Sequence, residues 1–177
     1  VLTDRSIIGH GIVMDHHPWL HWTSRDDLGR MAESGATIAH CPTVFVRRGI
    51  ALNTFGEYGR RGINLGIGTD TYPHNYLDEM RTALYTARAV GGSVADLKTT
   101  DVFNAATVGG ARALRRDDIG RLAVGARADI VMSDLKHPAM MPVREPLRSL
   151  IYVAGDRAIR DVFVDGDHVV RAGQVQT

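Results

Sequence analysis

The fold is decided by an apolar, glycine-rich stretch that ends on an acidic residue, Ile63-Asn64-Leu65-Gly66-Ile67-Gly68-Thr69-Asp70. Short apolar runs bounded by turn residues are typical of buried strands. Two earlier runs have the same form: residues 6–10 end on His10, and residues 36–41 carry His40 and stop at Pro42. Strands that alternate with helices are normally parallel, and their carboxyl ends meet at one edge of a sheet. The sequence therefore predicts an α/β fold that gathers His10, His40 and Asp70.

Segments with helical periodicity lie between and after these strands. Leu28 and Met31 indicate a helix that is capped by Thr23 or Ser24 and ended by Gly35. A short helix is expected around Phe55. Further helices are predicted over residues 77–90 and 101–107, and another is expected to begin at residue 109.

The last third of the chain has a different pattern. Strands are predicted over residues 130–132, 149–153, 159–164 and 168–171, and residues 165–168 are typical of a tight hairpin turn. We therefore divide the chain into residues 1–118, which carry the β/α pattern, and residues 119–177, a smaller β-rich segment.

The composition excludes several classes of protein. Hydrophobic residues make up 44% and charged residues 23%, which is ordinary for a globular protein. A net charge of +1 argues against a nucleic-acid partner, and no apolar run reaches the roughly 20 residues of a membrane span. The single cysteine, Cys41, excludes an intramolecular disulfide and, with no signal-peptide pattern at the start, favours a cytoplasmic location.

The three polar strand ends carry the chemistry of a metal site. Imidazole and carboxylate are ligands of catalytic zinc or ferrous iron, and a carboxylate beside a metal-bound water can act as its general base. Each residue alone has a structural alternative, such as a buried imidazole bonded to backbone. His74 follows Asp70 by four residues and either contacts substrate or is an exposed loop residue. Trp22 either stacks on a heteroaromatic ring or packs beneath its loop.

Several motifs together resemble those of a known family. They are Gly9-His10, Ala39-His40-Cys41-Pro42, the stretch 65–70, Asp78-Glu79-Met80-Arg81 and Gly125-Ala126-Arg127-Ala128-Asp129. The chain resembles the metal-dependent amidohydrolase superfamily, in the branch of cytosine deaminase, chlorohydrolase and S-adenosylhomocysteine deaminase. The resemblance implies the C-terminal part of a (β/α)₈ barrel, with strands 6–8 and their helices, followed by a small β-sandwich segment.

The resemblance also implies roles for the candidate residues. Asp70 would bind one divalent metal, zinc or iron, and move protons. His10 would hydrogen-bond the attacking water or the substrate, or serve as a second metal ligand. His40, His74 and Trp22 would bind substrate. The His-x-His motif, a further metal-binding histidine and the catalytic glutamate of the family have no counterpart in the chain, which we therefore expect to be part of a longer enzyme.

Two functions follow from these observations. The first is hydrolysis of a non-peptide C–N bond, most concretely deamination of a small heteroaromatic amine by a metal-dependent hydrolase. The second is a non-catalytic fragment that lacks most metal ligands and acts as an assembly or interaction module. Strands with an open edge favour pairing with another chain. We therefore expect a homo-oligomer or association with a missing N-terminal half.

Overall fold

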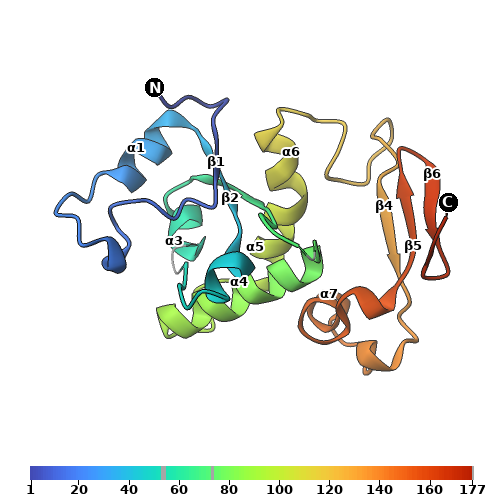
Figure 1. Ribbon diagram of the computed structural model, residues 1–177. Helices are drawn as coiled ribbons and strands as arrows, with labels where there is room; N and C mark the ends of the chain where they lie inside the picture. The colour runs from blue at the N-terminus through green and yellow to red at the C-terminus, as the bar shows by residue number, and fades with distance from the viewer. Residues whose placement is uncertain (53–54, 73, 177) are drawn as a thin grey trace.

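Two separate sheets organise the computed structural model, which describes residues 1–52, 55–72 and 74–176 (Figure 1). The first sheet is parallel and consists, in spatial order, of β1 (Ile7–Gly9), β2 (Thr37–His40) and β3 (Asn64–Ile67). The second is antiparallel and consists of β4 (Ile130–Ser133), β5 (Ile159–Val164), β6 (Asp167–Arg171) and β7 (Gln174–Val175). The predicted α/β class is therefore confirmed.

The register of the first sheet aligns the ends of its strands. Thr37 of β2 pairs with Ile7 of β1 on one side and with Asn64 of β3 on the other. Since all three strands run in the same direction, their carboxyl ends lie at one edge. The predicted parallel arrangement of residues 6–10, 36–41 and 63–70 is present in the structure.

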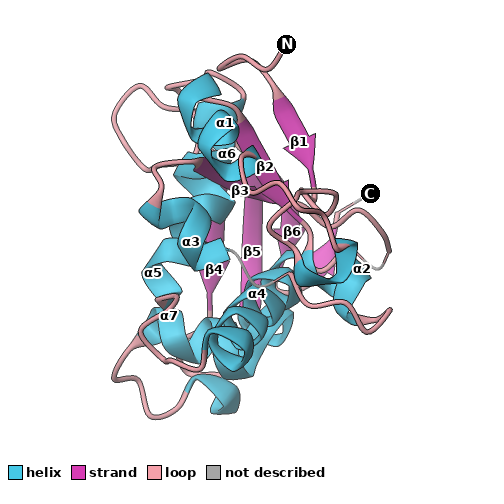
Figure 2. Ribbon diagram, turned by 90° about the vertical axis from the view of Figure 1, so that its left-hand side faces the viewer, coloured by secondary structure: helices cyan, strands magenta, loops and turns pink. Residues whose placement is uncertain are grey.

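Helices flank the parallel sheet and pack into its core (Figure 2). The longest, α4 (Tyr76–Gly91), begins where the Asn75 side chain accepts a hydrogen bond from the Asp78 N–H at 3.2 Å. Ile38 of β2 and Leu84 of α4 are completely buried in the same core. The other α-helices are α1 (Asp27–Ser34), α2 (Pro42–Val46), α3 (Phe55–Arg60), α5 (Thr99–Asn104), α6 (Gly110–Ala113) and α7 (Pro146–Ser149). Short 3₁₀ turns span Pro18–Leu20, Pro138–Met140 and Gly155–Ala158, and wide helical turns span Ala105–Gly109 and Leu150–Ala154.

The strand predicted over residues 149–153 is wrong. This segment is helical, because α7 runs directly into the wide turn Leu150–Ala154. Ile151 is fully buried in the core that contains α4, and its carbonyl accepts a hydrogen bond from Arg81 Nε at 2.7 Å. A short apolar run does not distinguish a strand from a buried helical turn, and packing against α4 decides the outcome.

The helices predicted over residues 101–107 and from residue 109 are one continuous helical segment. It runs through α5, the wide turn Ala105–Gly109 and α6 without a break. The glycine pair Gly109-Gly110 lies within this helical segment, and Gly109 approaches the backbone of β3 so closely that a side chain does not fit.

This close approach gives a test of the fold. A Cβ atom on Gly109 would lie 1.9 Å from the backbone oxygen of Leu65, whereas a Cβ on Gly110 would meet no atom within 4 Å. Gly109→Ala should lower the free energy of unfolding by about 3 kcal/mol through overpacking. Gly110→Ala should raise it by about 0.5–1 kcal/mol, because alanine is the better helix former. Urea denaturation of the two variants measures the difference, and equal stabilities would contradict this packing.

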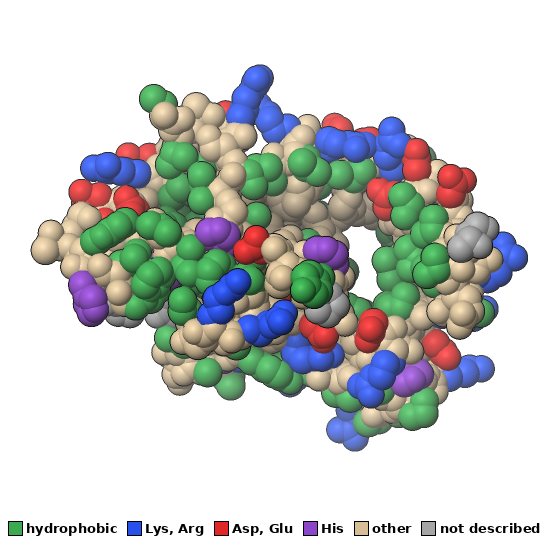
Figure 3. All heavy atoms as spheres, viewed as in Figure 1, with side chains coloured by type: hydrophobic (Ala, Val, Ile, Leu, Met, Phe, Trp, Pro, Cys, Tyr) green, Lys and Arg blue, Asp and Glu red, His purple; other side chains and the backbone are tan. Residues whose placement is uncertain are grey.

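The second sheet has little apolar core of its own. Among the described residues of β4 to β7, only Asp161 is buried, at 7% exposed, and its carboxylate lies 2.9 Å from His168 Nε2. Val131 and Val164 are more than half exposed. Figure 3 shows an opening through the molecule between its two parts, with hydrophobic side chains beside it.

The proposed division near residue 118 stays a prediction. The chain after this point forms the second sheet, which fits the division. Residues 146–154, however, return to pack on α4 of the first unit.

Candidate active site

Two of the predicted site residues follow the carboxyl ends of the outer strands. The His10 N–H donates to the Ala39 carbonyl at 2.8 Å, and the Gly68 N–H donates to the His40 carbonyl at 2.9 Å, so the ladder continues past β1 and β3. His10 and Asp70 both adopt left-handed backbone, with φ of 48° and 54°. This conformation is uncommon outside glycine and is often found at functional sites. The chain therefore turns sharply at both residues, as it leaves the sheet.

The His10 ring is oriented by two contacts. It packs edge-on against the Phe45 ring, with centroids 5.0 Å apart, and its Nδ1 accepts a hydrogen bond from the Ile12 N–H at 3.4 Å. An accepting Nδ1 leaves the proton of a neutral imidazole on Nε2. In this tautomer Nε2 can donate to water or substrate, and the two predicted roles of His10, hydrogen bonding and metal binding, both stay predictions.

Asp70 carries a carboxylate that is available to a ligand. Its side chain is exposed and makes no hydrogen bond or ion pair within the described part of the chain.

Four residues later, the exposed His74 is held by its own loop, because its Nδ1 lies 2.8 Å from the Thr69 hydroxyl. Substrate binding by His74 stays a prediction.

His40 lies beneath the edge and not on its surface. It is 1% exposed, and its ring packs edge-on against Phe55, with centroids 4.9 Å apart. Neither of its ring nitrogens has a hydrogen-bond partner within the described residues. Burial, with a further contribution from His17, lowers the pKa of His40 to about 3, so the ring is neutral. Its predicted role in substrate binding requires a ligand that reaches the interior, and it stays a prediction.

The loop between β1 and α1 is fixed by buried polar residues that the sequence did not single out. The Asp15 carboxylate accepts hydrogen bonds from the N–H groups of Asp26 and Asp27, at 2.7 and 3.3 Å. These bonds cap α1, so the capping predicted for Thr23 or Ser24 is wrong. Burial raises the pKa of Asp15, but these hydrogen bonds outweigh it and the pKa is lowered.

Trp22 projects from this anchored loop. It is 44% exposed, and its carbonyl accepts a hydrogen bond from Arg25 Nη1 at 2.6 Å. An exposed indole on a fixed loop is compatible with stacking on a ligand ring. No hydrogen bond or ring contact connects Trp22 with His10 or Asp70 in the described residues, and its substrate role stays a prediction.

Glu79 is a buried carboxylate that was quoted above only as part of the motif 78–81 and was not predicted as a site residue. This residue of α4 is 2% exposed, and its Oε2 accepts a hydrogen bond from the Thr43 N–H of α2 at 3.1 Å. Burial raises the pKa of the Glu79 carboxyl. The signal was present in the sequence, because Glu79 lies on the same helix face as the buried Met80 and Ala83. A charged residue on an apolar helix face marks a specific partner.

The described residues fit a metal ion only in part. The Asp70 carboxylate is a suitable ligand, and no described residue competes for it with a hydrogen bond or ion pair. No group of three His, Cys, Asp or Glu side chains within the described residues is arranged to hold a metal. A zinc site at this edge therefore needs ligands that residues 1–52, 55–72 and 74–176 do not supply.

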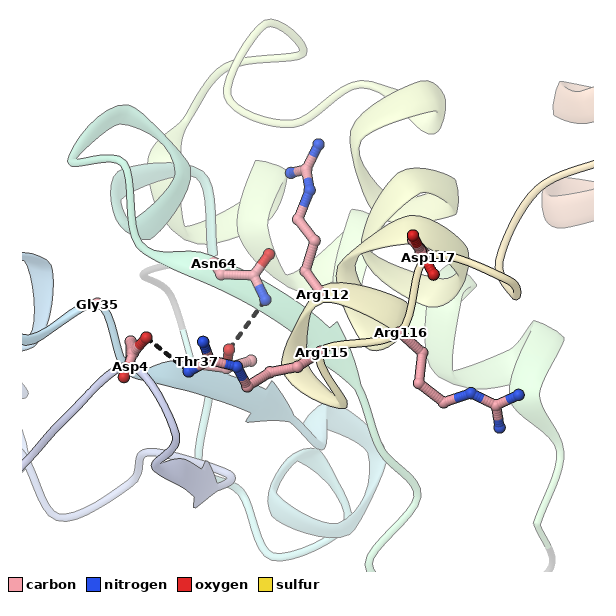
Figure 4. A pocket seen from close by; sticks show the side chains of 8 residues that line it. All are labelled: Asp4, Gly35, Thr37, Asn64, Arg112, Arg115, Arg116 and Asp117. Atoms are coloured by element: carbon pink, nitrogen blue, oxygen red, sulfur yellow. Dashed lines mark hydrogen bonds and ion pairs between the residues drawn. The ribbon is translucent and has the colours of Figure 1, made fainter. Parts of the chain in front are cut away.

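A cavity of about 590 Å³ lies at the opposite, amino edge of the sheet. Asp4 and Gly35 precede β1 and β2, while Thr37 and Asn64 begin β2 and β3 (Figure 4). Asn64 donates to the Thr37 hydroxyl at 2.9 Å, and Arg115 pairs with Asp4 at 2.6 Å. These groups satisfy one another and lie away from the strand ends that carry His10 and Asp70. We therefore do not assign the reaction to this cavity.

A parallel sheet with polar residues at its carboxyl edge defines an α/β protein of the kind that places its ligand site there. Residues 2–169 match the amidohydrolase family, and the chain belongs to it. The resemblance noted in the motifs is therefore confirmed.

Curated relatives share the whole length of the chain. It is 31% identical to a 5-methylthioadenosine/S-adenosylhomocysteine deaminase of Pyrococcus abyssi, over 100% of this chain and 42% of the relative. It is 33% identical to the protein of the same name from Pyrococcus horikoshii, over 100% of this chain and 41% of the relative. The chain thus spans about two fifths of the length of these relatives.

Solved structures agree with this assignment. An adenosine deaminase from Xanthomonas campestris with bound zinc superposes with a TM-score of 0.86 at 31% identity, covering 99% of this chain and 39% of that one. Atrazine chlorohydrolase from Arthrobacter aurescens, complexed with zinc, gives 0.82 at 26% identity, covering 98% and 38%. In the described part of our chain, no helix has the length and apolar character that crossing a membrane requires.

Proposed function

We propose that the chain supplies the carboxyl-edge residues of a metal-dependent hydrolase that cleaves non-peptide C–N bonds. The observation that carries the proposal is the pair His10 and Asp70, both in left-handed backbone at the carboxyl edge of a parallel sheet in an amidohydrolase. In this proposal β1, β2 and β3 are strands 6, 7 and 8 of a (β/α)₈ barrel, and β4 to β7 belong to a small β-sandwich.

Proton transfer is the part of the reaction that this chain's residues can perform. The Asp70 carboxylate accepts a proton from the attacking water, and later delivers it to the leaving amine. His10 donates its Nε2 proton in a hydrogen bond to the water or to the charge that develops on the substrate. One bound divalent metal, zinc or iron, would lower the pKa of water toward neutrality, with Asp70 among its ligands.

The proposed substrate is a small heteroaromatic amine, which gains a hydroxyl group from water and releases ammonia. Relatives named as deaminases of 5-methylthioadenosine, S-adenosylhomocysteine and adenosine support this class. The chlorohydrolase among the similar structures shows that another leaving group is compatible with this fold. The buried free thiol of Cys41 fits a reducing cytoplasm as the site of action.

A second candidate function is assembly. The exposed Val131 and Val164 of the second sheet and the exposed Ile7 of β1 favour association with another copy or with the remainder of a barrel. Sedimentation of the 177-residue chain checks this, and we expect a species heavier than a monomer.

The test of the proposed function is ammonia release by the zinc-loaded whole protein, with adenosine, S-adenosylhomocysteine and amino-triazines as substrates. We expect release from at least one substrate, and release that stops when the metal is removed by a chelator and returns when zinc is added. Loaded, folded protein that releases ammonia from none of them contradicts the proposal.

A further inference from the structure

The short helix α2 contacts both sides of the candidate site. Its residue Phe45 packs against the His10 ring, with centroids 5.0 Å apart. The next residue but one, Arg47, follows the helix and donates from Nη1 to the Tyr72 carbonyl at 3.3 Å. Tyr72 lies two residues after Asp70. The helix and the residue that directly follows it thus connect the neighbours of both proposed catalytic groups.

A helix this short does not hold its position without outside contacts. Isolated helices of fewer than about 12 residues are marginal in water, and the first N–H groups of every helix lack intrahelical acceptors. α2 begins at Pro42, two residues after β2 ends at His40, and no side chain of its own caps it. The Thr43 N–H is instead accepted by the Glu79 carboxylate of α4, at 3.1 Å.

Burying the Glu79 carboxylate costs desolvation free energy that a purely structural residue would not require. It is 2% exposed, and no cation forms an ion pair with it in the described part of the chain. A leucine or methionine at this place would be buried without the cost of desolvating a carboxylate. Its partner Thr43 is 36 residues away in sequence, so its hydrogen bond fixes the distance between α2 and the 16-residue helix α4.

We propose that Glu79 is a positioning residue that fixes α2 through Thr43, and through α2 orients the His10 ring and the loop that carries Asp70. The contact route is Glu79 to Thr43, then Phe45 to His10 on one side and Arg47 to Tyr72 on the other. The catalytic consequence rests on the proposed function, because it requires His10 and Asp70 to act on a substrate.

The route can be tested in the 177-residue chain by NMR. Glu79→Leu removes the acceptor and keeps an apolar filling, whereas Glu79→Gln retains an oxygen that can accept from Thr43. In the leucine variant we expect amide exchange at Thr43 to accelerate at least about tenfold. The ring resonances of His10 should move as well, because the ring current of Phe45 depends on their geometry. The glutamine variant should restore both signals.

Thr86→Ala is the matched control on the same helix. The Thr86 hydroxyl donates to the Thr82 carbonyl at 2.7 Å and makes no hydrogen bond to α2 in the described residues. This variant should leave Thr43 exchange and the His10 resonances unchanged. Equal changes in Thr86→Ala and Glu79→Leu would indicate general loosening and would overturn the proposal, as would a leucine variant identical to the parent chain.

Kinetics of the zinc-loaded whole protein provide the second readout. Misplacement of reacting groups by about 1 Å costs up to about 10²-fold in rate, so Glu79→Leu should lower kcat about 10- to 100-fold. Glu79→Gln should stay within about threefold. A leucine variant with unchanged kcat overturns the positioning role. If the parent protein itself is inactive, the proposed function fails, whereas the NMR readout still decides whether Glu79 positions His10.

Discussion

Asp70→Asn lowers kcat of the whole protein by about 10²- to 10⁴-fold, the range that a positioned acid–base group contributes. An amide is a poor metal ligand and cannot accept the proton of the attacking water. The substitution should leave the backbone unchanged, because asparagine tolerates the left-handed conformation that Asp70 adopts at φ 54°. The exposed side chain also has no hydrogen bond or ion pair to lose within the described residues.

Steady-state kinetics on variants with equal zinc content measure this effect. His137→Ala is the control, because His137 lies at the start of the turn Pro138–Met140, outside the parallel sheet. It should keep kcat within about twofold, because its Nδ1 caps only that turn, by accepting from the Ala139 N–H at 3.1 Å, and lies outside the strand ends that carry His10 and Asp70. A loss of less than about tenfold in Asp70→Asn would remove Asp70 from the proton transfer.

His168→Ala should affect stability and not catalysis, because the His168 side chain has specific partners in the second sheet. The ring stacks on Phe163 and its Nε2 lies 2.9 Å from the Asp161 carboxylate. Burial raises the pKa of Asp161, but hydrogen bonds from Ala172 and His168 outweigh it and the pKa is lowered. The variant should therefore weaken the β5–β6 hairpin and leave kcat of the folded protein unchanged.

The sequence predicts the parts of this fold that depend on local pattern. Three apolar runs that end near His10, His40 and Asp70 are sufficient to predict the parallel sheet. The buried face of α4 can be predicted from the spacing of its apolar residues. The helix α2 was missed because Pro42 indicates the end of a strand and equally suits the first turn of a helix.

The unpredicted features of the site depend on partners far apart in the chain. Asp15 caps α1 from 11 residues away, and Glu79 reaches Thr43 across 36. No local pattern specifies such pairs. The position of Glu79 on the apolar face of α4 indicates that it is buried, but not which residue it contacts. The burial of His40 is of the same kind: the end of a strand predicts its position in the sheet, and only the packing of Phe55 determines that the ring is enclosed.

Acidification should destabilise the chain through the buried imidazole of His40. Its pKa is lowered from 6.5 to about 3 by burial, and nearby His17 adds to the effect. Between these values the unfolded state binds a proton that the folded state does not bind. The stability contribution is therefore fully present above pH 6.5 and is lost as the pH falls toward 3. His16, whose pKa burial lowers to about 4, acts in the same direction.

His40→Leu should remove the part of this acid sensitivity that comes from His40, because leucine fills the space against Phe55 and has no group to protonate. The part that comes from His16 should remain. For the parent chain, one such histidine costs roughly 2 kcal/mol of unfolding free energy between about pH 7.5 and about pH 5. Urea denaturation at the two pH values measures the loss, and exposed His21→Gln is the control that should retain it. At neutral pH the leucine variant should be at least as stable as the parent, because it buries no polar nitrogen without a partner. If His40→Leu and the parent chain lose the same stability on acidification, the His40 ring is accessible to water. This outcome would contradict its burial and place the ring at the surface of the candidate site.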